Sequence, residues 1–167
     1  MIFMSQSGIT DPAKHAEWSE WYVEHLRIMR SVDGIGSAER FQTTTPNWPP
    51  SLAMYSIRSA EVFVDPYYLK IRGMGPWAGL IEKRFYQRNL FEAVSPGSST
   101  LIAPDVPPQS ALVVTDQIQP HLEIEGLKLL WLKSVGLDQS TPYRGIAVIS
   151  KNDIPIISKH QELAVYL

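Results

Sequence analysis

His25 is the leading candidate for a catalytic residue in this chain, because a histidine can take up and release a proton near neutral pH. It lies in a segment of helical periodicity, 13–32, in which Trp18, Tyr22 and Met29 recur on one face. At about 100° per residue, His25 falls in the middle of this apolar face and is predicted to point toward a sheet. It is then either a general acid or base, or a core histidine bonded to a backbone carbonyl.

Aromatic and basic side chains could complete a site around His25. Tyr22 lies almost one turn before it and could donate a hydrogen bond to a developing oxyanion. Arg40 could hold a carboxylate or enolate, or could be a solvated charge on a strand, where Phe41 faces the opposite side. The candidates for the substrate-binding wall are Trp18, Trp21, Met29, Arg40, Phe41, Tyr55 and Tyr166.

The sequence lacks the common signatures of metal and cofactor sites. There is no cysteine, which excludes thiolate nucleophiles and cysteine-ligated zinc. The four histidines are scattered, without the spacing of a zinc motif. Gly73-Met74-Gly75 does not continue into a dinucleotide-binding GxGxxG, and Walker A and GxSxG motifs are absent. We therefore expect neither a metal nor an organic cofactor.

Charge and hydropathy narrow the expected partners. Fifteen basic and seventeen acidic residues among 167 argue against nucleic acid, whose phosphates require a basic surface. The first residues, MIFMSQSGITDP, lack the basic region of a signal peptide, and no apolar run approaches the roughly 20 residues that cross a bilayer. We expect a cytoplasmic protein without membrane contact. Five Trp, seven Tyr and five Phe favour a small apolar or aromatic ligand.

The elements that would position these residues are predicted in two series, joined by a linker rich in Pro and Ser at 95–109. The first series has strands over 1–7, 35–44, 52–57 and 85–94 and helices over 12–32, 65–72 and 75–84. The second has strands over 111–118, 145–151 and 162–167 and a helix over 125–135. The order strand–helix–strand–strand therefore occurs twice.

Two short similarities accompany this repeated order. Arg30-Ser31-Val32 is similar to Lys133-Ser134-Val135, and Leu52-Ala53-Met54-Tyr55 is similar to Leu163-Ala164-Val165-Tyr166, although short apolar strands can also match by chance. We predict an α+β fold with a ferredoxin-like repeat at 1–94, the linker at 95–109 and a shorter βαββ repeat at 110–167 packed against the first. The two would form a barrel within one chain, and a homodimer is possible.

The helix around His25 also resembles a known family. Trp18-Ser19-Glu20-Trp21-Tyr22-Val23-Glu24-His25-Leu26, then Val32-Asp33-Gly34-Ile35 and Arg40-Phe41, resemble the EthD-like branch of the dimeric α/β-barrel superfamily. The resemblance covers about residues 1–94, and Asp33 stands where that family usually has proline. It implies a ferredoxin-like dimeric α/β barrel whose cavity takes small, mostly apolar molecules. It also implies that His25 is the family's helix histidine and that Tyr22 is the neighbouring ring.

These observations lead to one leading hypothesis on function. We expect a cofactor-independent enzyme of lyase or isomerase type that moves a proton next to the carbonyl of an apolar or aromatic substrate in the barrel cavity. The alternatives are a cofactor-free monooxygenase of aromatic compounds, a non-catalytic small-molecule binding protein, and a structural protein whose interior is filled by side chains. No residue in the sequence separates a lyase from an oxygenase.

Overall fold

The computed structural model describes residues 1–94 and 101–167, which form an α+β protein on an eight-stranded antiparallel sheet, so the predicted class is confirmed. The strands are β1 (Ile2–Ser7), β2 (Ile35–Gln42), β3 (Ser51–Ile57), β4 (Gln87–Ala93), β5 (Ser110–Gln117), β6 (Leu130–Leu137), β7 (Tyr143–Ser150) and β8 (Ala164–Tyr166). The α-helices are α1 (His15–Met29), α2 (Pro66–Ile71) and α3 (Ile154–Ile157). The 3₁₀ helices are η1 (Pro12–Lys14), η2 (Ala60–Val64), η3 (Gly75–Leu80), η4 (Lys83–Phe85) and η5 (Lys151–Asp153).

The strand order repeats across the sheet. It runs β2-β3-β1-β4 and then β6-β7-β5-β8, so each half places its second, third, first and fourth strands in the same sequence. The halves join where β4 pairs with β6. At the outer edges, Gln42 of β2 and Leu167 after β8 exchange two backbone hydrogen bonds of 2.8 Å. The two edge strands therefore meet, and the sheet curves back on itself.

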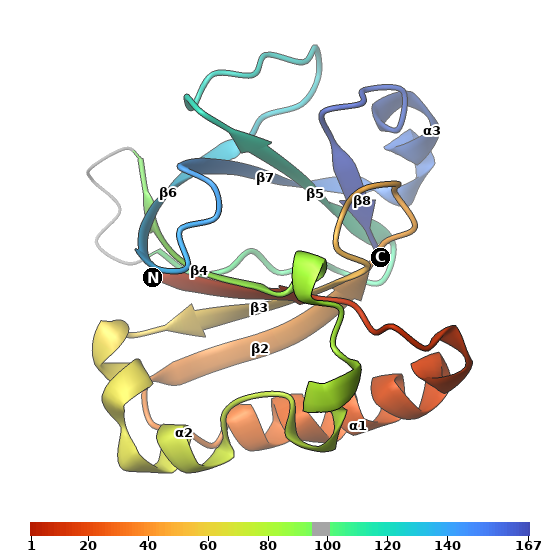
Figure 1. Cartoon of the computed structure of the whole chain (residues 1–167). Helices are drawn as coiled ribbons and strands as arrows, with labels where there is room; N and C mark the ends of the chain where they lie inside the picture. The colour runs from red at the N-terminus through yellow and green to blue at the C-terminus, as the bar shows by residue number, and fades with distance from the viewer. Residues whose placement is uncertain (95–100) are drawn as a thin grey trace.

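The first half of the sheet lies between two different layers. In Figure 1, α1 and α2 lie below β2 and β3, whereas the strands of the second half lie above the first half. Because successive strand residues point to opposite faces, β1 sends Phe3 toward the helices and Ile2 and Met4 toward the second half. All six residues of β1 are buried, which is expected of a strand covered on both faces.

Two apolar clusters occupy these layers. The helix-side cluster packs α1 and the region around α2 against the sheet, and includes Phe3, Trp18, Tyr22, Leu26, Met29, Tyr55, Tyr68 and Met74. The inner cluster lies between the two halves and includes Ile2, Met4, Phe41, Leu52, Met54, Phe91, Leu112, Val114, Leu132, Ile146 and Tyr166. The separation of these clusters decides which predicted site residues can meet.

Local sequence explains how α1 is held over the sheet. The Asp11 side chain accepts a hydrogen bond of 3.0 Å from the Ala13 amide, and Pro12 opens the first helical turn, as predicted. The helix ends at Met29, three residues before the predicted end. Gly34 closes the turn at φ +88°, and a Cβ there would approach Cγ2 of Val62 to 2.8 Å. Glycine is therefore required at this position.

The second half differs from its prediction. The helix expected over 125–135 is wrong: residues 130–137 form β6, which pairs with β4 and β7. The intrinsic helix preference of a Leu- and Lys-rich segment is small, and two neighbouring strands outweigh it. Lys133–Val135 therefore lie in a strand rather than at a helix end. The segment Leu163–Tyr166 leads into the fourth strand of its half, not the third. The repeat lies in the strand order, and these two sequence similarities are not equivalent positions.

Two smaller differences concern the segments that flank β4. The helix predicted over 75–84 is two 3₁₀ segments, η3 and η4, and β4 begins at Gln87 rather than at residue 85. Of the predicted linker, residues 95–100 lie outside the described residues. Residues 101–109 contain neither helix nor strand, and the Ala103 amide donates to Oγ of Ser56 at 2.9 Å. Within 1–94 and 101–167, no helix is long and apolar enough to cross a membrane.

Candidate functional site

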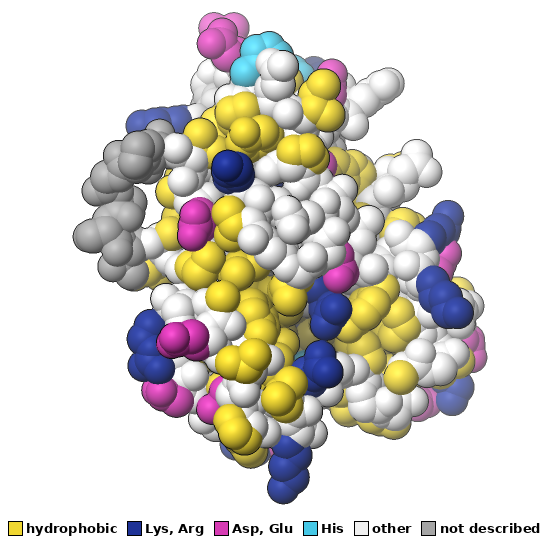
Figure 2. Space-filling view, turned by 60° about the vertical axis from the view of Figure 1, so that its left-hand side comes forward, with side chains coloured by type: hydrophobic (Ala, Val, Ile, Leu, Met, Phe, Trp, Pro, Cys, Tyr) yellow, Lys and Arg dark blue, Asp and Glu magenta, His cyan; other side chains and the backbone are white. Residues whose placement is uncertain are grey.

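A pocket of about 300 Å³ lies between the helices and the first half of the sheet, beside His25. This volume is at the small end of the range for ligand pockets and suits a molecule of one or two rings. The surface shown in Figure 2 is hollowed in its lower part, where basic and hydrophobic side chains border the hollow. The lining residues are Phe3, Ser5, Tyr22, His25, Met29, Tyr55, Tyr68, Leu69, Arg72, Gly73, Met74, Tyr86 and Arg88.

His25 faces this pocket from α1 and is half-buried. Its ring stacks on Trp21 with centroids 4.6 Å apart and meets Tyr22 edge-on at 5.8 Å. Among the described residues, none makes a hydrogen bond to the imidazole, so it lacks the backbone carbonyl that would hold a core histidine. Burial lowers the pKa of His25, which keeps the ring neutral at pH 7 and able to accept a proton.

Four phenol groups share the pocket with His25, those of Tyr22, Tyr55, Tyr68 and Tyr86. Burial raises the pKa of Tyr22, Tyr55 and Tyr68, so these hydroxyls stay protonated and can donate hydrogen bonds. At Tyr22, the hydroxyl of Ser7 and the charge of Arg40 oppose this rise in pKa. The pocket therefore offers one neutral base and several neutral donors, which can stabilise an enolate oxygen.

Arg40 lies behind the pocket and supports its wall. Its guanidinium carbon is 4.4 Å from the ring centroids of both Trp18 and Tyr22. Its Nε donates to Oγ of Ser51 at 2.7 Å, and Nη1 donates to Oγ of Ser19 at 3.2 Å. Burial lowers the pKa of Arg40 to about 10, which still leaves it charged at pH 7. These contacts let Arg40 position the Tyr22 ring from behind, and Arg40 is not one of the residues that line the pocket.

The structure brings together part of the predicted site. His25, Tyr22, Met29 and Tyr55 line one pocket. Trp18 is fully buried behind them, and Trp21 backs the histidine ring.

Phe41 and Tyr166, in contrast, belong to the inner cluster. Phe41 follows Arg40 on β2 and so must face away from α1. Tyr166 lies on the far half of the sheet, so Tyr55 and Tyr166 do not share a cavity.

Several lining residues were missed by sequence reasoning, among them Tyr68, Arg72, Met74, Tyr86 and Arg88. One signal was available for Arg88. It lies two residues before Leu90 on β4, and Leu90 belongs to the helix-side cluster, so period-2 alternation places Arg88 on the same face. Tyr68 and Arg72 are brought to the pocket by the docking of α2, which no local pattern encodes.

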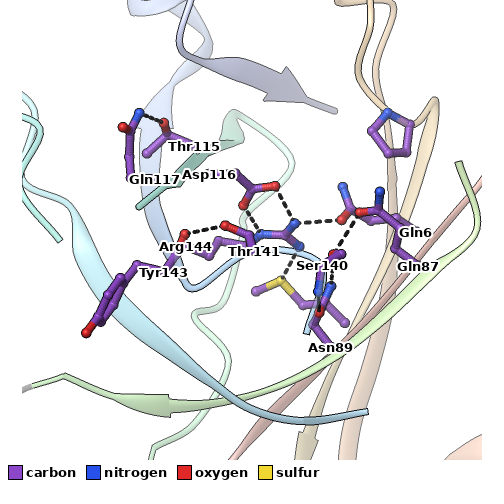
Figure 3. A network of polar contacts seen from close by, with 12 residues as sticks. Gln6, Gln87, Asn89, Thr115, Asp116, Gln117, Ser140, Thr141, Tyr143 and Arg144 are labelled. Carbon is purple, nitrogen blue, oxygen red and sulfur yellow. Dashed lines mark hydrogen bonds and ion pairs between the residues drawn. The ribbon is translucent and has the colours of Figure 1, made fainter. Parts of the chain in front are cut away.

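A separate network of polar side chains lies between the two halves of the sheet (Figure 3). Arg144 is fully buried, and its Nε and Nη2 donate to the two carboxylate oxygens of Asp116 at 2.7 and 2.8 Å. Nη2 also donates to Oε1 of Gln6 at 2.7 Å. The Tyr166 hydroxyl nearby donates to the carbonyl of Pro49 at 2.8 Å. These groups have their partners within the protein, which is the pattern of a structural ion pair.

The comparisons with known proteins add no identity. No family model matches the chain, and no curated protein or solved structure matches it. In the part of the chain that the structure describes, no three His, Asp or Glu side chains gather as metal ligands would.

Proposed function

We propose that the protein is a cofactor-independent enzyme of lyase or isomerase type that moves a proton next to the carbonyl group of a small apolar or aromatic substrate. The observation that carries this proposal is the imidazole of His25, which faces the pocket with no hydrogen-bond partner among the described residues. The substrate would lie between the helices and the sheet. The space between the two halves holds the inner cluster instead.

The proposed chemistry uses His25 as the base. Its neutral ring accepts the proton from the carbon beside the carbonyl. The electron pair of that C–H bond forms a C=C bond with the carbonyl carbon, and the π pair of the C=O bond moves to oxygen to give an enolate. A phenol of Tyr22 or Tyr55 donates a hydrogen bond to that oxygen. The protonated ring then returns the proton to another carbon, which isomerises the substrate, or to a leaving group, which completes an elimination.

We also infer the finer fold class, a ferredoxin-like α/β barrel like those of the dimeric α/β-barrel superfamily. Here one chain supplies both halves of the barrel. The strand order of the halves supports this inference. Each half has the order 2-3-1-4, which is the 4-1-3-2 order of the ferredoxin-like unit counted from the opposite edge. The two backbone hydrogen bonds between Gln42 and Leu167 support closure. The run that resembles the EthD-like branch forms α1, and α1 supplies His25 and Tyr22 to the pocket.

The experiment that tests this function follows hydrogen exchange in deuterated water. The protein is incubated with a panel of aromatic ketones and keto acids, and the signal of the proton beside the carbonyl is followed by NMR. We expect exchange that depends on the protein and is lost in His25→Gln. No exchange with any member, while members raise the melting temperature, would contradict catalysis and favour the binding protein.

Oxygen consumption separates the enzyme classes. A lyase or isomerase leaves dissolved oxygen unchanged while the substrate signal disappears. An oxygen electrode trace that falls in step with the substrate would contradict the proposed class and favour the cofactor-free monooxygenase.

A further inference from the structure

The charged side chains that line the pocket are all basic. Its lining includes two arginines, Arg72 and Arg88, and no Asp or Glu. The imidazole of His25 and the phenols of Tyr22, Tyr55 and Tyr68 are neutral at pH 7. A site with fixed positive charge and neutral donors favours a ligand that brings negative charge.

Arg88 has hydrogen-bonding capacity to spare. Its Nε is buried and has no partner among the described residues. Its Nη2 reaches the carboxylate of Asp138 only at 3.4 Å, beyond the range typical of an arginine–carboxylate bond. That carboxylate accepts a shorter bond, 2.8 Å, from the backbone amide of Arg88. Asp138 is therefore held mainly by the main chain and leaves the Nη1 and Nη2 donors of Arg88 largely available.

Arg72 reaches the same pocket from a different element. It caps the C-terminal end of α2, is exposed, and forms no ion pair within residues 1–94 and 101–167. Burial raises the pKa of Tyr68, and the charges of Arg88 and Arg72 both act in the opposite direction, so both cations lie near this hydroxyl. Two cations from α2 and β4 thus converge on one part of the wall.

We propose that Arg72 and Arg88 bind the carboxylate of an anionic substrate, a small aromatic or unsaturated ring acid, at the end of the pocket beside Tyr68. Guanidinium groups match a carboxylate with paired N–H donors, which the two terminal nitrogens of an arginine can supply together. The ring would lie among Phe3, Tyr55 and Met74, with its reacting carbon toward His25. The position of the reacting carbon rests on the proposed function, whereas the preference for an anion does not.

The binding of two matched probes tests the preference of the pocket for an anion. 1-Naphthoate and 1-naphthamide have the same ring and nearly the same shape, but only the first carries a charge. We expect isothermal titration calorimetry to give wild-type protein about 10- to 100-fold tighter binding of the naphthoate, the usual worth of hydrogen bonds to a charged group. Arg88→Gln and Arg72→Gln should each weaken naphthoate binding and leave naphthamide binding nearly unchanged.

Arg58→Gln is the matched control, because Arg58 is exposed, pairs with Asp33 and does not line the pocket. It should keep the full preference. The variant at Arg72 guards against misfolding, because its side chain is exposed and truncation should leave the melting temperature unchanged.

Three outcomes separate this inference from the proposed function. Equal affinity of the wild type for both probes, or a preference that survives in the Arg72→Gln/Arg88→Gln double variant, would overturn the anion site even if proton exchange occurs. A clear preference without exchange on any keto acid would support the anion site and overturn the enzyme. Failure of both probes to bind at millimolar concentration would overturn the inference.

Discussion

Polar side chains lie against both faces of the first half of the sheet, and their hydrogen bonding differs between the two faces. On the inner face, Arg144 is fully buried, but it is bonded to Asp116 and Gln6 within the protein. On the helix-side face, the ring of His25 has no hydrogen-bond partner among the described residues and faces a pocket, which Arg88 also lines. Polar groups satisfied by the protein maintain the fold, whereas polar groups left open to a pocket are available to a ligand.

Burial alone does not distinguish a functional polar group from a structural one. Arg144 is more deeply buried than His25, and its charge is the more costly of the two to hide. What separates them is whether the remaining hydrogen-bonding capacity is used. The comparison predicts that changes on the helix-side face alter chemistry and those on the inner face alter stability.

The largest effect is expected from His25→Gln. Loss of a general base should lower the rate of substrate proton exchange by roughly 10²- to 10⁴-fold, measured by NMR in deuterated water. The melting temperature should stay nearly constant, because the ring has no hydrogen bond to lose. His15→Gln, on the exposed side of the same helix, is the control and should leave both quantities unchanged. A melting temperature several degrees lower in His25→Gln would place the histidine in the core.

Arg144→Met should have the reverse signature. Removing one member of a buried ion pair costs about 3–5 kcal/mol, and the lower end applies here because the Asp116 side chain is 30% exposed. Urea unfolding should therefore show a loss of about 3 kcal/mol, with naphthoate binding unchanged. The double variant Asp116→Leu/Arg144→Met should recover much of the loss. A loss no greater than that of Arg58→Met, whose ion pair is exposed, would contradict the structural role.

A pair of tyrosine variants sharpens the same contrast. Tyr22→Phe should slow proton exchange about tenfold, because Tyr22 lines the pocket and its phenol would donate to the enolate oxygen. Tyr166→Phe should leave exchange unchanged and cost about 1 kcal/mol of unfolding free energy, since its hydroxyl bonds the carbonyl of Pro49. Equal effects of both variants on exchange would remove the distinction between the two faces.

The smallest effect is expected from pH. Burial lowers the pKa of His25 below its ordinary value of 6.5, so below that pH the unfolded chain takes up a proton more readily than the folded protein. This contribution to stability is complete above pH 6.5 and is lost as the pH falls toward the folded-state pKa. The melting temperature is measured at pH 7.5 and at pH 5.5. Its decrease between these two pH values should be smaller in His25→Gln than in the wild type. An identical fall would show that His25 does not titrate differently on folding.

Much of the helix-side site could be predicted because it depends on local periodicity. Trp18, Tyr22 and Met29 share one helix face with His25, and this spacing orients the histidine toward the sheet whatever the rest of the fold. The alternation on β2 likewise separates Arg40 from Phe41. These relations involve residues a few positions apart, so the backbone geometry of one element fixes them.

The features of the fold and the site that could not be predicted depended on contacts between distant segments. Residues 130–137 became a strand because β4 and β7 pair on either side, a choice that outweighs the weak helix preference of the segment. Tyr166 and Tyr55 were separated by the layer of sheet between them. Arg72 and Arg88 meet at one pocket only because α2 packs against α1, at the pocket that β4 also borders.

The sequence by itself therefore determined the α+β class, the start and apolar face of α1 and the direction of His25 from it, since these follow from repeats of two and 3.6 residues. The tertiary structure alone decided that the pocket lies between helices and sheet and that two arginines converge on it. It also decided that Arg144 has its partners and His25 does not. Satisfaction of a polar group depends on which distant atoms arrive beside it, and no local pattern records that.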